Sequence, residues 1–187
     1  MRSRRVLALT AALVCCLGFA SFGERQAAPR AAARDLLGVW DLVSYEDHDK
    51  NGKISYGWGP QPSGVLTYSP GGRMTVQFMR DPRSTFAAGR VWSRDNRELL
   101  ATAQAAEIRD AYSGYYAYFG TYDFDERAQA VTHHIRASLR SHEVGADNVR
   151  PFELKGDQLV MRIPVTTDTG EARTRFVVWR RAERFEP

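Results

Sequence analysis

The feature that most constrains the fold is a series of short segments with strand-like alternation, separated by turn-forming residues. Eight such segments span residues 38–45, 65–68, 74–78, 115–124, 131–139, 150–154, 159–163 and 176–179. They are rich in β-branched and aromatic residues, as strands are, and are bounded by clusters of Gly, Pro, Asp and Ser. Residues 69–72 and 155–157 are typical of hairpin turns. The pattern therefore predicts one antiparallel β-domain.

One α-helix is expected between the third and fourth of these segments. Asp95 and Glu98 have the spacing of a capping box, and the residues as far as Ala111 favour a helix. Eight short strands with one inserted helix predict a small, mostly β, antiparallel barrel, because closure removes exposed strand edges. Such a barrel has room for one small ligand. The helix would then cover one barrel end and control entry.

The first residues have the features of a secretory signal peptide. Arg2, Arg4 and Arg5 precede an apolar run over residues 6–20, which contains both cysteines and ends in small residues. A general secretory signal fits this leader, and residues 3–7 loosely resemble a twin-arginine signal. A lipoprotein signal fits poorly, because Val14 rather than a small residue precedes Cys15. The run is shorter than the ~20 residues of a membrane span, which favours cleavage. We therefore expect an exported protein, periplasmic or extracellular, without a stable membrane span after leader removal.

Loss of the leader changes what the composition implies. The net charge of +4 falls to +1, because residues 1–20 hold three arginines and no acidic residue. A balanced charge of mixed sign does not predict a nucleic-acid partner. The mature chain also lacks cysteine, so a packed core rather than disulfides must stabilise it. The predicted organisation is a signal peptide (1–20), a disordered linker (21–34), one barrel domain (35–182) and a C-terminal tail (183–187).

A set of ordered motifs carries a family resemblance. They are residues 37–45, 64–69, 72–74 and 118–122, the pair His133-His134 with Ser138, then Gly145, Arg150, and residues 152–157 and 179–181. In this order, over residues 35–182, the chain resembles the bacterial and fungal lipocalin-like domain family of the calycin superfamily. The resemblance implies a small up-and-down barrel with an interior pocket, and it supplies neither catalytic residues nor a cofactor. It also implies that Trp40 plugs the narrow end and that a last-strand arginine, Arg180 or its neighbour Arg181, packs over it.

Several polar residues are candidates for contact with a ligand. His133 falls on the apolar face of its strand, as either a hydrogen-bonded core residue or a pocket group. Arg150 alternates with Phe152, and a guanidinium that faces an apolar cavity needs either an anionic ligand or an internal salt bridge. Tyrosines add rings for apolar contact and hydroxyls for orientation, and Gly120 would leave space beside them. The candidate ligand-binding residues are Tyr68, Tyr116, Tyr118, Tyr122, His133 and Arg150.

Two motifs suggest metal sites and are better explained otherwise. Residues 47–54 match the first half of a calcium loop, but Trp58 stands where the bidentate Glu belongs, so we predict a polar turn. His133 and His134 are adjacent in a strand and point to opposite faces, which is unsuited to one zinc ion. No metal or cofactor is predicted.

The predicted function is the binding of a small apolar or amphipathic molecule inside the barrel. Two alternatives stay open. One is an enzyme of the isomerase or cyclase type that acts on a small hydrophobic metabolite in the same cavity. The other is a barrel filled by side chains that serves as a protein-interaction module. The sequence contains no nucleophile elbow, phosphate loop or zinc-protease motif, and it determines neither the ligand nor the oligomeric state.

Overall fold

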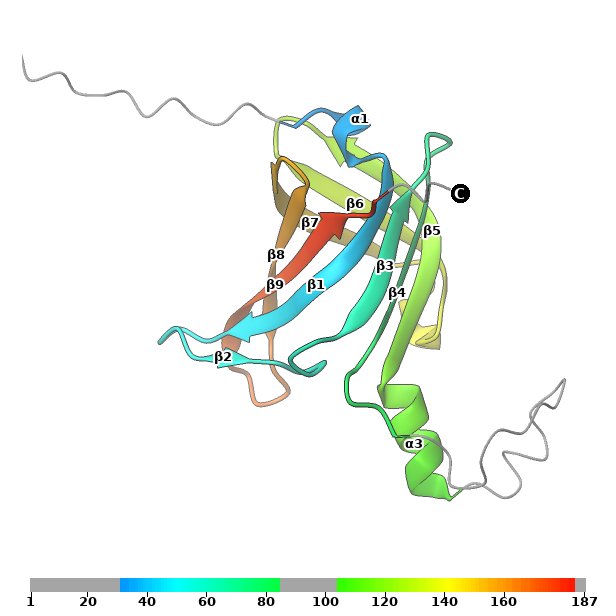
Figure 1. Cartoon of the computed structure of the whole chain (residues 1–187), viewed down its shortest axis with the longest axis vertical. Coiled ribbons are helices and arrows are strands. Elements are labelled where there is room, and N and C mark those ends of the chain that lie inside the picture. Colours follow the sequence, from blue (N-terminus) through cyan, green and yellow to red (C-terminus); the bar gives the residue numbers. More distant parts are fainter. Residues whose placement is uncertain (1–30, 85–103, 184–187) are drawn as a thin grey trace, which may run out of the picture.

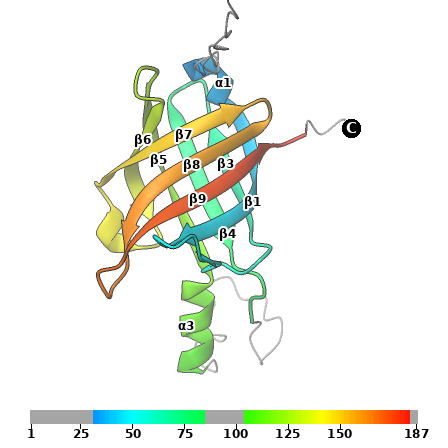
Figure 2. The same ribbon diagram turned by 90° about the vertical axis from the view of Figure 1, so that its left-hand side faces the viewer.

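The chain folds into a closed antiparallel β-barrel (Figures 1 and 2). The computed structural model describes residues 31–84 and 104–183. The strands are β1 (Gly38–His48), β2 (Ile54–Ser55), β3 (Ser63–Tyr68), β4 (Arg73–Met79), β5 (Tyr115–Asp125), β6 (Ala130–Ser138), β7 (Asp147–Lys155), β8 (Gln158–Thr166) and β9 (Ala172–Arg181). The helical elements are α1 (Ala33–Leu36), α3 (Ala105–Ser113) and the 3-10 turn η1 (Ser141–Glu143).

Strand pairing follows the chain order and then returns to its start. Each strand from β3 to β9 is hydrogen-bonded to the next, and β1 pairs with both β3 and β9. A bulge between Leu42 and Ser44 interrupts the β1–β9 register, which bends this long strand around the barrel. The short strand β2 pairs with the end of β1. The eight predicted strands and the up-and-down barrel are confirmed; β2 was not predicted.

The period-2 pattern of the sequence places the core inside the barrel. On β4, for example, Met74, Val76 and Phe78 are buried, while Thr75 and Gln77 between them are exposed. The largest fully buried side chains are Trp40, Trp179, Tyr68, Leu36, Leu66, Met74, Leu159, His133 and Val131. His133 is therefore a polar group within an otherwise apolar and aromatic interior.

Gly120 has a different role from the one expected. A Cβ atom at this position would lie 1.9 Å from the carbonyl oxygen of His134 on β6. The β5–β6 register shifts between Phe119 and Gly120, so the missing side chain permits a close approach of two strand backbones. The space that Gly120 leaves is occupied by β6 rather than by a ring or a ligand.

One end of the barrel is closed by α1 and the side chain of Trp40. The Trp40 indole is fully buried, and its Nε1 donates to the carbonyl oxygen of Leu36 at 2.9 Å. The guanidinium carbon of Arg181 lies 4.1 Å from the ring centroid of Trp40. Its two Nη atoms donate to the carbonyl oxygens of Leu37 and Asp35 at 2.8 and 2.5 Å. We call this arrangement the closed end.

The closed end decides between two candidate arginines and moves the predicted start of the domain. Arg181, not Arg180, covers Trp40, because successive strand residues face opposite sides: Arg181 shares the inward side of β9 with Trp179, and Arg180 is exposed. The folded part also begins before residue 35. Ala31 is buried, and α1 starts at Ala33, so these residues pack on the barrel rather than serve as linker.

The helix α3 lies at the opposite end of the barrel and points away from it (Figures 1 and 2). Its start is capped by the Glu107 carboxylate, which accepts from the backbone nitrogen of Gln104 at 2.7 Å. Residues 95–103 of the predicted helix lie outside the described residues, and the described helix continues to Ser113. No α3 residue is buried, so this part of the helix does not cover the barrel end as a gate would.

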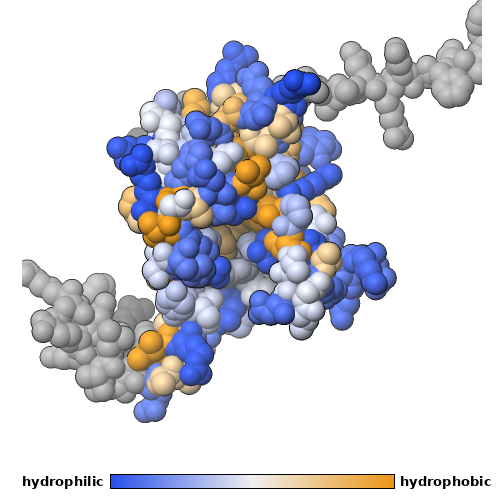
Figure 3. Space-filling model, turned by 180° about the vertical axis from the view of Figure 1, so that it is seen from behind, coloured by the Kyte–Doolittle hydropathy of each residue, from blue (hydrophilic) through white to orange (hydrophobic). Residues whose placement is uncertain are grey.

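The outer surface mixes polar and apolar residues. Seen from behind, hydrophobic residues form separate patches among hydrophilic ones (Figure 3). Within residues 31–84 and 104–183, no helix is long and apolar enough to cross a membrane.

Candidate ligand cavity

A cavity of about 420 Å³ lies inside the barrel, away from the closed end. It extends to Val165 and Arg175, on the parts of β8 and β9 that are remote from Trp40. We call this side, bounded by β2, η1 and residues 167–171, the open end. The apolar and aromatic lining comprises Trp58, Leu66, Val76, Phe78, Met161, Ile163, Pro164, Val165, Val177 and Trp179. The polar lining comprises Tyr45, Tyr116, Tyr118, His133, Arg140, Glu143, Asn148, Arg150 and Arg175.

His133 is held between two tyrosine hydroxyls. Its Nε2 lies 2.6 Å from the Tyr68 hydroxyl, and its Nδ1 lies 2.7 Å from the Tyr118 hydroxyl. Burial is the main cause that lowers the pKa of His133 to about 3, and the positive charge of Arg150 adds to it. The imidazole is therefore neutral at physiological pH, with one protonated and one unprotonated ring nitrogen. This explains how a histidine is accommodated in the core.

Arg150 differs from the other arginines of the cavity in having no acidic partner. Within the described residues, ion pairs join Arg140 to Glu143 at 3.5 Å and Arg175 to Asp47 at 2.7 Å, and none involves Arg150. Arg150 has a long contact of 3.4 Å to the Val149 carbonyl oxygen, and it lines the cavity together with Tyr118. Burial raises the pKa of Tyr118 to about 12, and the Arg150 charge opposes this rise. The cavity therefore contains one cation that no described carboxylate neutralises.

Glu143 of η1 organises one side of the open end. One of its carboxylate oxygens accepts from the hydroxyls of Tyr116 at 2.6 Å and Ser138 at 2.8 Å. The Arg140 guanidinium packs over the Tyr116 ring, 4.5 Å from its centroid. Burial and the Glu143 hydrogen bond raise the pKa of Tyr116, so its hydroxyl stays a donor to Glu143.

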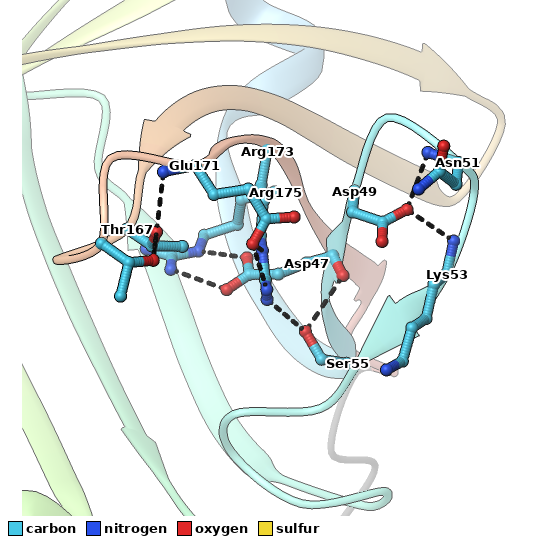
Figure 4. A network of polar contacts seen from close by, with 10 residues as sticks. Asp47, Asp49, Asn51, Lys53, Ser55, Thr167, Glu171, Arg173 and Arg175 are labelled. Atoms are coloured by element: carbon cyan, nitrogen blue, oxygen red, sulfur yellow. Dashed lines mark hydrogen bonds and ion pairs between the residues drawn. The ribbon is translucent and has the colours of Figure 1, made fainter.

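A second polar network lies across the open end, on β1, β2 and β9 (Figure 4). Asp47 binds Arg175 through both carboxylate oxygens, at 2.7 and 2.9 Å. Asp49 accepts from the backbone nitrogens of Asn51 and Lys53 at 2.8 and 2.9 Å. Both carboxylates of the candidate calcium loop are thus used within the protein, and the predicted polar turn is confirmed.

The fold agrees with a family comparison. The family model for the lipocalin-like domain matches residues 37–182, which is most of the chain. The chain belongs to the lipocalin-like domain family. A search of curated proteins found no significant match. The expected resemblance is therefore confirmed, and the assignment of a specific ligand depends on the residues of this lipocalin-like barrel.

The barrel brings together most, but not all, of the predicted ligand-binding residues. Tyr116, Tyr118, His133 and Arg150 line the cavity. Tyr68 is 1% exposed and lies behind His133, outside the lining. Tyr122 packs against Tyr68 at 4.7 Å between ring centroids and donates to the carbonyl oxygen of Ser69 at 3.0 Å, so it is also outside the lining.

The sequence prediction missed several cavity residues. Trp58 and Glu143 lie in a loop and in η1, where strand alternation gives no signal for the direction of a side chain. Arg175 lies just before the predicted segment 176–179, and its alternation with Val177 could have indicated that it faces the interior. Tyr45 ends the predicted segment 38–45, and its direction does not follow from alternation with Trp40. Beyond Leu42, the β1 bulge shifts the alternation by one residue, which hides Tyr45.

His134, on the outer surface, is separate from the cavity. Its Nδ1 lies 2.6 Å from Asp147, and its Nε2 lies 2.9 Å from Asp123, so β5, β6 and β7 are linked. The carboxylates are bound to opposite ring nitrogens, and they raise the pKa of His134. Adjacent histidines therefore serve two unrelated networks. In the described part of the chain, no cluster of three or more candidate ligands could hold a metal ion.

Proposed function

We propose that this protein is exported and binds a small amphipathic molecule inside the barrel. The observation that carries the proposal is the cavity of about 420 Å³, whose apolar lining surrounds an arginine without a carboxylate partner among the described residues. Ligand pockets typically have volumes of about 300–1,000 Å³ and a few polar groups that orient the ligand. The size and the lining both match this description.

Apolar contact would supply most of the affinity. Burial of ligand surface contributes about 25 cal/mol per Å² before the costs of association are subtracted. Leu66, Met161 and Val177 offer such contact in the interior, and the polar groups lie nearer the open end. The ligand would therefore insert its apolar part first and leave its polar part toward Arg150.

The alternatives fit less well. A barrel filled by side chains would have no cavity of this size. An enzyme that used His133 as a base would need a free ring nitrogen, and both are bound to tyrosine hydroxyls.

Ligand binding can be tested with the neutral dye Nile red and with displacement by a panel of lipids and hydrophobic metabolites. We expect saturable binding that Ile163→Trp weakens at least tenfold, because Ile163 lines the cavity. Val160→Trp is the matched control, since Val160 is on the same strand and outside the lining. Equal dye binding by both variants, or no binding by the wild type, would reject the proposal.

Export can be tested by expression of the full chain and mass determination of the product. We expect loss of residues 1–20 and recovery outside the cytoplasm. Replacement of Arg4 and Arg5 by lysine blocks export if the twin-arginine route is used and spares it otherwise. An uncleaved product that stays in the cytoplasm would contradict export without affecting the binding proposal.

A further inference from the structure

The tyrosines on either side of His133 have different surroundings, and this difference fixes the direction of their hydrogen bonds. The Tyr68 hydroxyl is fully buried, and His133 Nε2 is its one polar contact among the described residues. The Tyr118 hydroxyl contacts His133 Nδ1 and belongs to a residue that lines the cavity. One of the two phenols therefore reaches open space, and the other does not.

A neutral imidazole has one donor and one acceptor nitrogen, so two arrangements are possible. If His133 Nε2 donated to Tyr68, the Tyr68 proton would be buried without an acceptor, at a large cost in free energy. In the opposite arrangement, Tyr68 donates to Nε2 and Nδ1–H donates to Tyr118. The Tyr118 proton then points toward the cavity, where water or a ligand can accept it. This second arrangement satisfies every buried group of the three side chains.

Arg150 adds a second set of donors to the same cavity. A guanidinium has donors and no acceptor, and Arg150 lines the cavity with Tyr118, where its positive charge opposes the rise in the pKa of that phenol. Glu143, the carboxylate among the described lining residues, is already bound to Tyr116, Ser138 and Arg140. Apart from the long contact of Arg150 with the Val149 carbonyl oxygen, these cavity donors have no acceptor among the described residues.

We infer that Tyr118 and Arg150 form a two-donor site for a carboxylate group of the ligand. Tyr68 and His133 act as positioning residues, because they set the direction in which the Tyr118 hydroxyl donates. This inference rests on the proposed function and specifies its ligand as an amphipathic carboxylic acid. A neutral amphiphile of the same length would lose the charge-assisted hydrogen bonds.

The hydrogen-bond direction can be measured without any ligand, by NMR of the protein labelled with ¹⁵N-histidine. At pH 7 we expect His133 to show a protonated Nδ1 and an unprotonated Nε2. The resonances of His48, His134 and His142 are identified by substitution of each with glutamine, since all three lie outside the core. A protonated Nε2 at His133 would overturn the directed chain, whatever the cavity binds.

The ligand class is tested by a comparison of dodecanoate with dodecan-1-ol. We expect dodecanoate to bind at least about tenfold more tightly, the effect of one hydrogen bond to a charged group. Tyr118→Phe and Arg150→Gln should each remove most of this preference while dodecanol binding persists. Tyr68→Phe should reduce the preference although Tyr68 does not line the cavity, and Tyr122→Phe is its matched control.

The possible results distinguish failure of the carboxylate site from failure of the proposed function. Equal binding of both probes by the wild type would reject the carboxylate site and leave cavity binding in place. An unchanged preference in Tyr68→Phe would reject the positioning role. Failure of both probes, with Nile red still bound, would also overturn the carboxylate site, whereas loss of all binding would reject the proposed function itself.

Discussion

Both ends of the barrel contain arginines that face inward, but their partners differ. At the closed end, Arg181 stacks on Trp40 and donates to two backbone carbonyls. At the open end, Arg150 has no carboxylate partner among the described residues. The protein therefore holds one arginine by a ring contact and two hydrogen bonds, and it leaves the other without an acidic partner in the described residues. An arginine thus stabilises the fold at the closed end, whereas the arginine in the cavity is the one that we propose for ligand binding.

Removal of the Trp40 ring is expected to change the free energy of unfolding most. Trp40→Ala should lower the free energy of unfolding by about 3–5 kcal/mol, because a large buried side chain is lost and a cavity remains. Urea unfolding followed by circular dichroism measures this change. A loss below about 1 kcal/mol would show that the closed end is not a centre of stability.

Replacement of the closed-end arginine should have an intermediate effect. Arg181→Met should cost about 2 kcal/mol, because the cation–π contact and two hydrogen bonds to carbonyls are lost. Arg180→Met is the matched control and should stay within about 0.5 kcal/mol of the wild type, since Arg180 is exposed. Equal effects of the two substitutions would contradict the assignment of Arg181 to the closure.

The corresponding replacement at the open end should have the opposite sign. Arg150→Met should raise the free energy of unfolding by up to about 1 kcal/mol, because a partly buried charge without an acidic partner is replaced by an apolar group of similar size. The same urea titration measures it, in ligand-free protein. Destabilisation as large as that of Arg181→Met would mean that Arg150 is structural, and the contrast between the two ends would be lost.

The smallest effect concerns His134 on the outside of the barrel wall. Asp147 and Asp123 raise its pKa above the ordinary value, so the folded state binds its proton more tightly than the unfolded state. The stabilisation is complete below the unfolded pKa of about 6.5 and disappears as pH rises through the higher folded pKa. His134→Gln should flatten the decrease in stability above pH 6.5, as measured by thermal unfolding at pH 6, 7 and 8. An unchanged pH profile would contradict this coupling.

Strand alternation predicted the barrel well because the interior face is set by local periodicity. On β6 the alternation correctly placed His133 inside, and on β7 it correctly placed Arg150 in the cavity lining. On β9, Arg181 is two residues after the buried Trp179 and therefore faces the interior, so alternation would have indicated Arg181 rather than Arg180 as the residue that covers Trp40. The family resemblance alone left those two neighbours open.

The rest of the site depends on contacts between residues distant in sequence. Tyr68 and His133 are 65 residues apart, and no local pattern shows that they meet. The η1 turn brings Glu143 to Tyr116, and the β1 bulge turns Tyr45 inward. These features arise from loop geometry and strand register, which periodicity does not determine.

The pairing of β1 with β9 also determines when the protein can fold. The first barrel strand to be synthesised is hydrogen-bonded along residues 40–48 to the last one. Until β9 has been made, β1 and β8 are both open strand edges, and such edges promote aggregation. A ribosome that stops before residue 172 therefore releases a chain with two unprotected edges. The final ten-residue strand, Ala172–Arg181, completes the fold and removes this hazard.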